Sequence, residues 1–215
     1  MKRLLCLLIP CVVGGCGTPT PLSEAQRERV ASQRVLYAVH YSAARGFAVK
    51  PEDHARARFI SRAVPGRLSF RERSGPSGLP TDPASHIKES LAALLGAELG
   101  VGRVESVQLR STDDAVAVLR KRFGAGAVLD VRTQHWGLDQ GNVVYRARVR
   151  MIDLDAGKIV WIGACEWKPI GSVERAPGAD DLYADDAHLL QVVLRRAADA
   201  CVRSLRVSLL ASQRL

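Results

Sequence analysis

Alternation of apolar and polar side chains predicts five strands in this chain. It is clearest where Val35, Tyr37, Val39 and Tyr41 alternate with their neighbours, because a period of two is typical of a strand. Four later segments are predicted as strands in the same way: 103–109, 127–134, 143–152 and 158–167. The pattern therefore predicts one strand early in the chain and four in its second half.

Helical periods and cap residues predict three longer helices. Asp82 and Pro83 are placed as the N-cap and first residue of a helix that ends near Gly100. A second helix follows a cap region at residues 111–114 and ends at Gly124 or Gly126. The last helix spans about residues 186 to 210 and carries one apolar stripe: Leu190, Leu194, Ala197, Cys201, Leu205 and Leu209.

The order of these elements predicts a single α+β domain over residues 34–215. Strand, helix, strand, helix, three strands and helix favour two layers, with a mainly antiparallel sheet of about five strands covered on one face by helices. The long C-terminal helix belongs to that covering layer. Residues 46–81 are basic and contain four prolines, and beyond a short helix at 52–64 they allow no assignment.

The register of the last two strands is also predictable. They flank Asp155-Ala156-Gly157, which fits a type I turn followed by a bulge and pairs Leu154 with Lys158. The residues that face the core then pair as follows: Met151 with Trp161, Val149 with Gly163, Ala147 with Cys165, and Tyr145 with Trp167.

The first sixteen residues have the pattern of an export signal. Lys2 and Arg3 precede an apolar stretch that is too short to span a bilayer. The run Val13-Gly14-Gly15-Cys16 resembles the lipobox of bacterial lipoproteins, in which an aliphatic residue and two small residues precede the modified cysteine. The alternative is an ordinary cleaved signal with an incidental cysteine.

The lipobox resemblance implies that residues 1–15 are removed and that Cys16 carries a diacylglycerol and a further acyl chain, such as palmitate. Several acyl chains on one residue anchor a protein stably to a membrane. Residues 16–33 then form a tether, with Ser23 and Gln26 spaced as a capping box for a short helix. Gly17 follows the cysteine in place of Asp, which favours the periplasmic face of the outer membrane over the inner membrane.

Cysteine usage supports export. Cys6 and Cys11 leave with the signal and Cys16 is lipidated, so Cys165 and Cys201 remain in the folded part. An even pair in an oxidising compartment favours a disulfide, here between the core face of a strand and the apolar stripe of the last helix. The alternative is two separate buried thiols.

A row of arginines is the most prominent group of charges. Arg146, Arg148 and Arg150 alternate along one strand, and Arg132 lies on the strand before it. One interpretation is a surface for an anionic envelope partner. The favoured interpretation is a solvated sheet face on which Arg146 lies opposite Glu166, with Asp130 near enough to pair. The formal net charge of +9 is spread along the chain and does not indicate a nucleic-acid partner.

No motif for catalysis, metal or cofactor binding stands out. The five histidines, His40, His54, His86, His135 and His188, have no partner at metal-ligand spacing. The acidic cluster of Asp180, Asp181, Asp185 and Asp186 is more readily explained as the start of a helix. The chain is therefore expected to use no metal or cofactor and not to be an enzyme.

Residues 123–167 resemble small periplasmic lipoproteins related to the TolB amino-terminal domain and the CsgG-type secretion lipoproteins. The resemblance lies in the runs 124–131, 143–147 and 153–161. It implies a non-catalytic accessory or scaffold role in envelope assembly, transport or maintenance, with an envelope protein as partner and with no prediction of oligomeric state. Two alternatives are an auxiliary lipoprotein of an ABC-type lipid transport system and a hydrolase with a dispersed site.

Overall fold

The computed structural model describes residues 21–41, 48–49, 81–110, 113–139, 142–168 and 179–210. The predicted signal, Cys16 and the predicted helix at 52–64 lie outside these residues. The helices are α1 (Glu24–Ala31), α3 (Pro83–Leu99), α4 (Val116–Phe123) and α5 (Ala179–Leu210). The strands are β1 (Leu36–Tyr41), β2 (Ala48–Val49), β3 (Val104–Leu109), β4 (Ala127–Asp139), β5 (Asn142–Asp153) and β6 (Lys158–Trp167).

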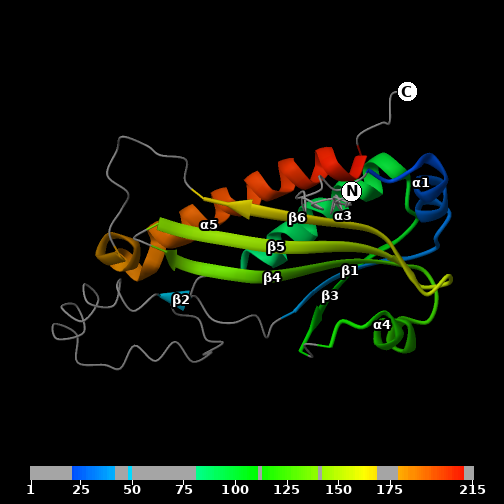
Figure 1. Ribbon diagram of the computed structural model, residues 1–215, viewed down its shortest axis with the longest axis horizontal. Helices are drawn as coiled ribbons and strands as arrows, with labels where there is room; N and C mark the ends of the chain where they lie inside the picture. The colour runs from blue at the N-terminus through cyan, green and yellow to red at the C-terminus, as the bar shows by residue number, and fades with distance from the viewer. Residues whose placement is uncertain are drawn as a thin grey trace, which may run out of the picture.

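The strands form one mixed sheet in the order β3-β1-β4-β5-β6, with β2 paired to β4 (Figure 1). The α+β class and the long C-terminal helix are confirmed. Antiparallel pairing is confined to β4–β5 and β5–β6, whereas β1 pairs in parallel with β3 and with β4. Parallel neighbours arise because α3 and α4 each return the chain to the end at which the preceding strand began.

Helices α3 and α5 cover one face of the sheet, which we call the inner face (Figure 1). Its buried residues include Leu129, Met151, Leu194 and Leu205, all with at most 2% of their surface exposed. Helix α4 lies on the opposite, outer face, where Leu119 packs in a smaller second cluster. The expectation that the helices cover only one face is therefore incomplete, because α4 covers part of the other.

Local signals explain where α3 begins and ends. The Asp82 side chain accepts a hydrogen bond of 2.9 Å from the backbone N–H of Ala84, and Pro83 occupies the first turn. Gly100 ends the helix with a φ of 68°, a left-handed conformation that glycine adopts without strain. Both ends agree with the prediction.

The start of α4 differs from the prediction. Its N-cap residue is Ala115, which has no side chain able to cap the helix. Asp113 accepts a hydrogen bond of 3.1 Å from the backbone N–H of Ala115, while the Asp114 side chain points away to the sheet. The acidic residues expected to cap α4 are thus divided between the loop and the outer face.

The β5–β6 register is confirmed for all four predicted core pairs. The turn differs by one residue, because Asp153 rather than Leu154 pairs with Lys158, and the register shifts between Met151 and Ile152. Leu154 is fully buried in the outer cluster, and the Asp153 side chain accepts a hydrogen bond of 2.9 Å from the N–H of Ala156. Burial of Leu154 therefore displaces the bulge from the turn into the strand.

Helix α1 is part of the domain. Ser23 and Gln26 form the predicted capping box, and Leu22 and Val30 are buried in the inner core with 1% and 2% exposure. The Gln26 side chain also donates to the carbonyl of Val160 at 3.0 Å. The described part of the predicted tether therefore packs on the sheet.

Candidate functional site

The predicted arginine row divides into two groups on the outer face. Arg132, Arg148 and Arg150 converge on one carboxylate oxygen, Oδ2 of Asp114. The distances are 2.7 Å from Arg132 and 3.3 Å from Arg150, and Arg148 makes the third contact. We call this group, with Asp130, the arginine cluster.

Arg150 is the deepest member of the arginine cluster. Its side chain is 8% exposed, and its Nε donates at 2.6 Å to Asp130, which is fully buried. It also donates to the backbone carbonyl of Asp114 at 2.7 Å. Arg150 therefore joins strand β4 to the loop before α4.

The two carboxyl groups of the arginine cluster shift in opposite directions. Burial raises the pKa of Asp130, and the charge of Arg150 only partly offsets this effect. Burial acts in the same direction on Asp114, but the hydrogen bond from Arg132 and the charges of Arg150 and Arg132 together lower the pKa of Asp114. Asp114 thus serves as the shared anion of the cluster.

Arg146, the fourth arginine of the predicted row, lies apart. It pairs with Glu166 at 3.1 Å across the β5–β6 ladder, as expected from the register. Glu166 also contacts Lys168 at 2.6 Å, and Lys168 and Arg146 lower the pKa of Glu166. The described surface around Arg146 is therefore a set of exposed, paired charges.

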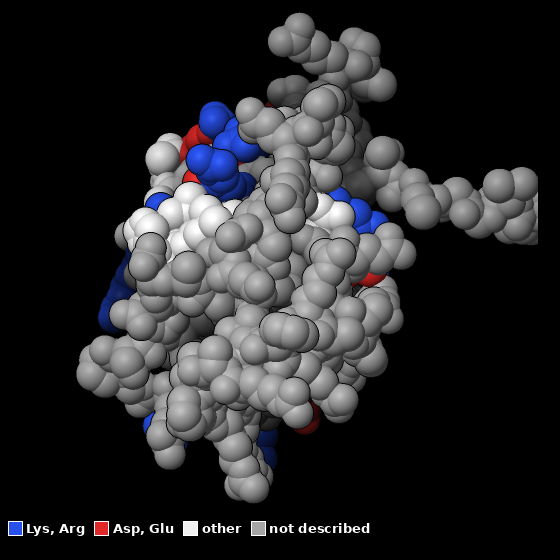
Figure 2. Space-filling view, turned by 90° about the vertical axis from the view of Figure 1, so that its left-hand side faces the viewer, with Lys and Arg blue, Asp and Glu red and all other residues white. Residues whose placement is uncertain are grey.

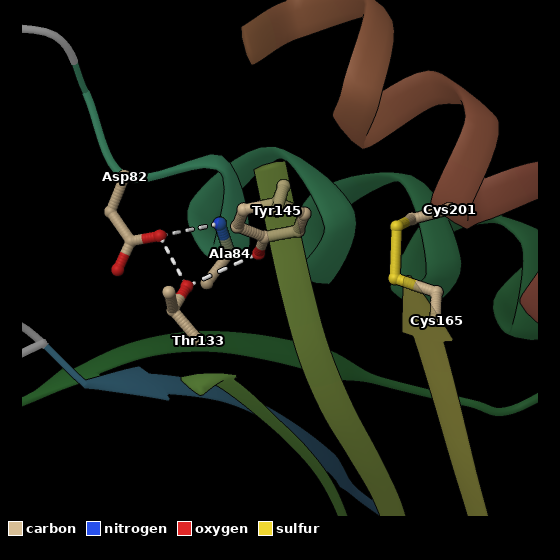
Figure 3. The surroundings of a disulfide bond; sticks show 6 residues. All are labelled: Asp82, Ala84, Thr133, Tyr145, Cys165 and Cys201. Carbon is tan, nitrogen blue, oxygen red and sulfur yellow. Dashed lines mark hydrogen bonds between the residues drawn. A yellow bond between two sulfur atoms is a disulfide. The ribbon is translucent and has the colours of Figure 1, made fainter. Parts of the chain in front are cut away.

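The inner face carries the disulfide. Cys165 on β6 and Cys201 on α5 are bonded, with their Cα atoms 5.5 Å apart and both side chains in the core (Figure 3). This confirms the predicted pairing. The bridge fastens the long helix to the last strand of the sheet.

A buried polar group lies near the disulfide (Figure 3). Thr133 donates to Asp82 at 2.5 Å and lies 3.1 Å from the hydroxyl of Tyr145, which is fully buried. Burial raises the pKa of Asp82 despite the hydrogen bonds from Thr133 and Ala84, and burial followed by the charge of Asp82 raises the pKa of Tyr145. These side chains join the start of α3 to β4 and β5.

A groove of about 490 Å³ lies between the first turns of α3 and the middle of α5. Eight of the twelve described residues that line it are polar or charged. His86 contacts Asp199 at 2.6 Å and Ser90 at 3.5 Å, but both contacts involve its Nε2. A serine–histidine–aspartate relay needs both ring nitrogens, so this trio is not arranged as one.

A second polar group lies between α3 and the β3 edge. Lys88, only 3% exposed, donates to Ser106 at 2.5 Å and contacts Glu89 at 2.8 Å. Ser106 in turn donates to Glu89 at 2.8 Å. Burial and the neighbouring Lys88 charge lower the pKa of His40 to about 4. Ser106 and Glu89 together provide the hydrogen-bond and charge partners of the buried Lys88 ammonium.

Among the described residues, no three His, Cys, Asp or Glu side chains are grouped so as to hold a metal ion. In the same part of the chain, no helix combines the length and the apolar character needed to cross a bilayer.

The end of the molecule nearest the β4–β5 connection shows Lys and Arg beside Asp and Glu at its upper margin (Figure 2). Charges of both signs are thus interspersed where described residues are visible on this face. The member of the arginine cluster that the sequence did not point to is Asp114. Its position on a loop before a helix predicts a cap, and only the fold brings it onto the arginines.

No family model matches the chain, and no curated protein matches it. Among solved structures, it is similar to the PelC dodecamer from Paraburkholderia phytofirmans, with 12% identity, a TM-score of 0.39, and 89% of this chain and 96% of that chain covered. It is also similar to lipoprotein GNA1162 from Neisseria meningitidis, with 14% identity, a TM-score of 0.31, and 80% and 96% covered. Similarities at this level place the chain in no family.

Proposed function

We propose that this protein is an exported lipoprotein, anchored through Cys16 and acting without catalysis as an accessory or scaffold protein of the bacterial envelope. The observation that carries the proposal is the use of all five cysteines. Two fall within the export signal, one ends the lipobox, and the remaining two are bonded to each other. Stable disulfides belong to oxidising compartments, so the bond supports the location that the first residues indicate.

The proposed absence of catalysis is supported by the roles of the charged groups described above. Asp114 satisfies three arginines, and Asp82 caps α3 while accepting from Thr133. Lys88 is held by Ser106 and Glu89. Each of these groups has a structural partner, and perturbed groups of this kind are found in structural networks as well as in active sites.

A lipid-carrier function receives less support from the described surface. A carrier needs an enclosed apolar groove for acyl chains. The groove between α3 and α5 is open to solvent rather than enclosed, and charged residues such as Arg195 line it beside apolar ones such as Leu194. We therefore rank the scaffold function above an auxiliary function in lipid transport.

The anchoring is tested in cells grown with a clickable fatty acid. The wild-type chain should become labelled and shift in mass by the acyl groups, whereas Cys16→Ser should remain unlabelled and keep a longer, unprocessed N-terminus. Labelling of the Cys16→Ser chain would contradict anchoring at this residue.

The partner is tested by affinity capture of the lipidated protein from detergent-solubilised envelopes, followed by identification of the chains that copurify. A scaffold should retain a defined envelope protein at constant stoichiometry. The same capture with Arg146→Gln tests whether the exposed arginine of the row contributes to partner binding. Recovery of lipid alone would count against the scaffold function.

A further inference from the structure

The buried position of Leu22 limits how far the domain can lie from a lipid anchor. Leu22 is 1% exposed in the inner core, and α1 begins two residues later. Six peptide units separate Cys16 from Leu22. Fully extended, they span no more than about 22 Å, so the α1 end of the domain must lie close to any bilayer that holds Cys16.

Three elements meet at this end of the domain (Figure 1). Arg29 of α1 pairs with Asp153 at the end of β5, which places α1 beside the β5–β6 turn. Across that turn, a Cβ at Gly157 would lie 3.2 Å from Nη1 of Arg120 on α4. We call the group formed by α1, the turn 154–157 and the last turn of α4 the anchor end.

The anchor end carries basic residues that are not neutralised within the described part of the chain. Arg120, Lys121 and Arg122 are consecutive and exposed in the last turn of α4, and Lys158 is exposed beside the turn. Among described residues none of the four pairs with a carboxylate, and Arg122 lies 5.8 Å from the centre of the Phe123 ring. The helix dipole also stabilises basic residues at a helix C-terminus, so their position at the end of α4 is favourable for the helix itself.

Acidic residues of the anchor end lie mainly on α1. Glu24 and Glu28 are exposed there, and Asp155 is exposed in the turn. Two exposed apolar side chains, in contrast, accompany the basic residues: Val118 on α4, 39% exposed, and Ile159 next to Lys158, 36% exposed. The α4 side is therefore both basic and partly apolar, as are surfaces that bind anionic membranes.

We propose that the anchor end docks on an anionic phospholipid surface through Arg120, Lys121, Arg122 and Lys158. The inference rests on the proposed function, because the short link to Cys16 brings this end to the bilayer. Each basic residue near an anionic surface strengthens attachment about fivefold, over a distance of about one Debye length. The acyl chains hold the protein at the membrane, and the basic residues select which side of the domain faces it.

Energy transfer from a fluorophore on the protein to an acceptor lipid tests the orientation. The mature, acylated protein is reconstituted in vesicles of phosphatidylcholine with or without phosphatidylglycerol. Because Cys165 and Cys201 are bonded and the sulfur of Cys16 is acylated, an added cysteine provides a single free thiol for labelling. Ala117→Cys labels α4 just before the basic run, and Leu189→Cys labels the first half of α5, a helix that begins at the end of the molecule away from α4 (Figure 1).

With phosphatidylglycerol present, transfer from Ala117→Cys should exceed transfer from Leu189→Cys severalfold. The triple change Arg120→Gln, Lys121→Gln and Arg122→Gln should reduce that ratio, as should salt at about 1 M, where the Debye length falls to about 3 Å. The matched control removes the same charge from exposed positions of α5, with Arg195→Gln, Arg196→Gln and Arg203→Gln, and should leave the ratio unchanged. The Cys165–Cys201 bond and the circular dichroism spectrum verify the fold of both triple variants.

Failure of the docking proposal differs from failure of the proposed function. A mature chain without acyl groups, shown by mass spectrometry, would overturn the anchor itself. An acylated chain with equal transfer from the two labels, or with a ratio independent of phosphatidylglycerol, would overturn docking alone. Energy transfer between donor-labelled and acceptor-labelled copies of Ala117→Cys, in place of transfer to lipid, would show that a second copy covers this end. That result would also overturn the docking proposal.

Discussion

On the inner face of the sheet, α3 and α5 bury an extended apolar core and a covalent bond joins α5 to β6. On the outer face, the short helix α4 buries only a small cluster, and the sheet beside it is filled by arginines that share two aspartates. Apolar burial tolerates small rearrangements, whereas a buried charge is stable only while its partner is in place. The two faces should therefore respond differently to substitution and to pH.

Removal of Arg150 should produce the largest effect. Arg150→Met leaves the fully buried Asp130 without its cation, and loss of one member of a buried pair typically costs about 3 to 5 kcal/mol. Urea unfolding at neutral pH measures this loss. Arg132→Met is the matched control, because Arg132 is 30% exposed and Asp114 keeps two other arginines, so the loss should be clearly smaller.

The double variant Arg150→Met with Asp130→Asn should recover more than half of the lost stability, because the unpaired charge is gone. Arg150→Met alone should also lose less at acidic pH, where Asp130 is protonated. Equal losses for Arg132→Met and Arg150→Met would show that Asp130 does not depend on its partner.

The disulfide should contribute slightly less than Arg150 to the free energy of unfolding. Cysteines 36 residues apart close a loop for which the chain-entropy model gives about 3 to 4 kcal/mol. Cys165→Ala with Cys201→Ala should lower the free energy of unfolding by that amount, and a reductant should have the same effect on the wild type. The reductant should leave the double variant unchanged, which separates the bond from other effects of reduction.

Two carboxyl groups should give opposite pH dependences, each on the order of 1 kcal/mol. The folded-state pKa of Asp114 is lowered, so its stabilising effect is present above the unfolded pKa and is lost as pH falls through the folded pKa. The folded-state pKa of Asp82 is raised, so ionised Asp82 costs stability at neutral pH and this cost disappears at acidic pH.

Thermal unfolding between about pH 3 and pH 7 tests this pair. Asp114→Asn should be destabilising at neutral pH and approach the wild type in acid. Asp82→Asn keeps a residue able to cap α3, and it should become more favourable relative to the wild type as pH rises. If the stability of both variants relative to the wild type changed with pH in the same direction, the opposite pKa shifts of Asp114 and Asp82 would be contradicted.

The smallest effect is expected at Arg146. Exposed ion pairs often contribute nothing measurable, and Glu166 retains Lys168 as a second partner. Arg146→Ala should therefore unfold at the wild-type urea midpoint. A clear loss of stability in Arg146→Ala would show that the exposed ion pair of the outer face matters as much as the buried pair of Arg150.

Features that depend on neighbouring residues were predictable from the sequence. The β5–β6 core register follows from alternation about a short turn, and the caps of α1 and α3 follow from Ser23 and Asp82. The bonded cysteines followed because the hairpin register and the helical stripe each placed one cysteine in the core. The parallel pairing of β1 was not predicted, but it could have been, because the order strand–helix–strand favours parallel neighbours.

The remaining features depend on tertiary position. Nothing near Asp114 in the sequence indicates that it serves three arginines, because the choice between a helix cap and a sheet contact is made by where α4 packs. The one-residue difference at the β5–β6 turn has a similar origin, since Leu154 is drawn into the outer cluster. Local propensity is overridden at such points by burial.

The Cys165–Cys201 bond also has a consequence for limited proteolysis. A protease that cuts once at any peptide bond between these cysteines produces two fragments that remain a single covalent molecule. Such a nicked chain migrates as intact protein on a non-reducing gel and separates only after reduction. A single cut between Cys165 and Cys201 therefore cannot release the C-terminal fragment from the domain without a change in redox conditions.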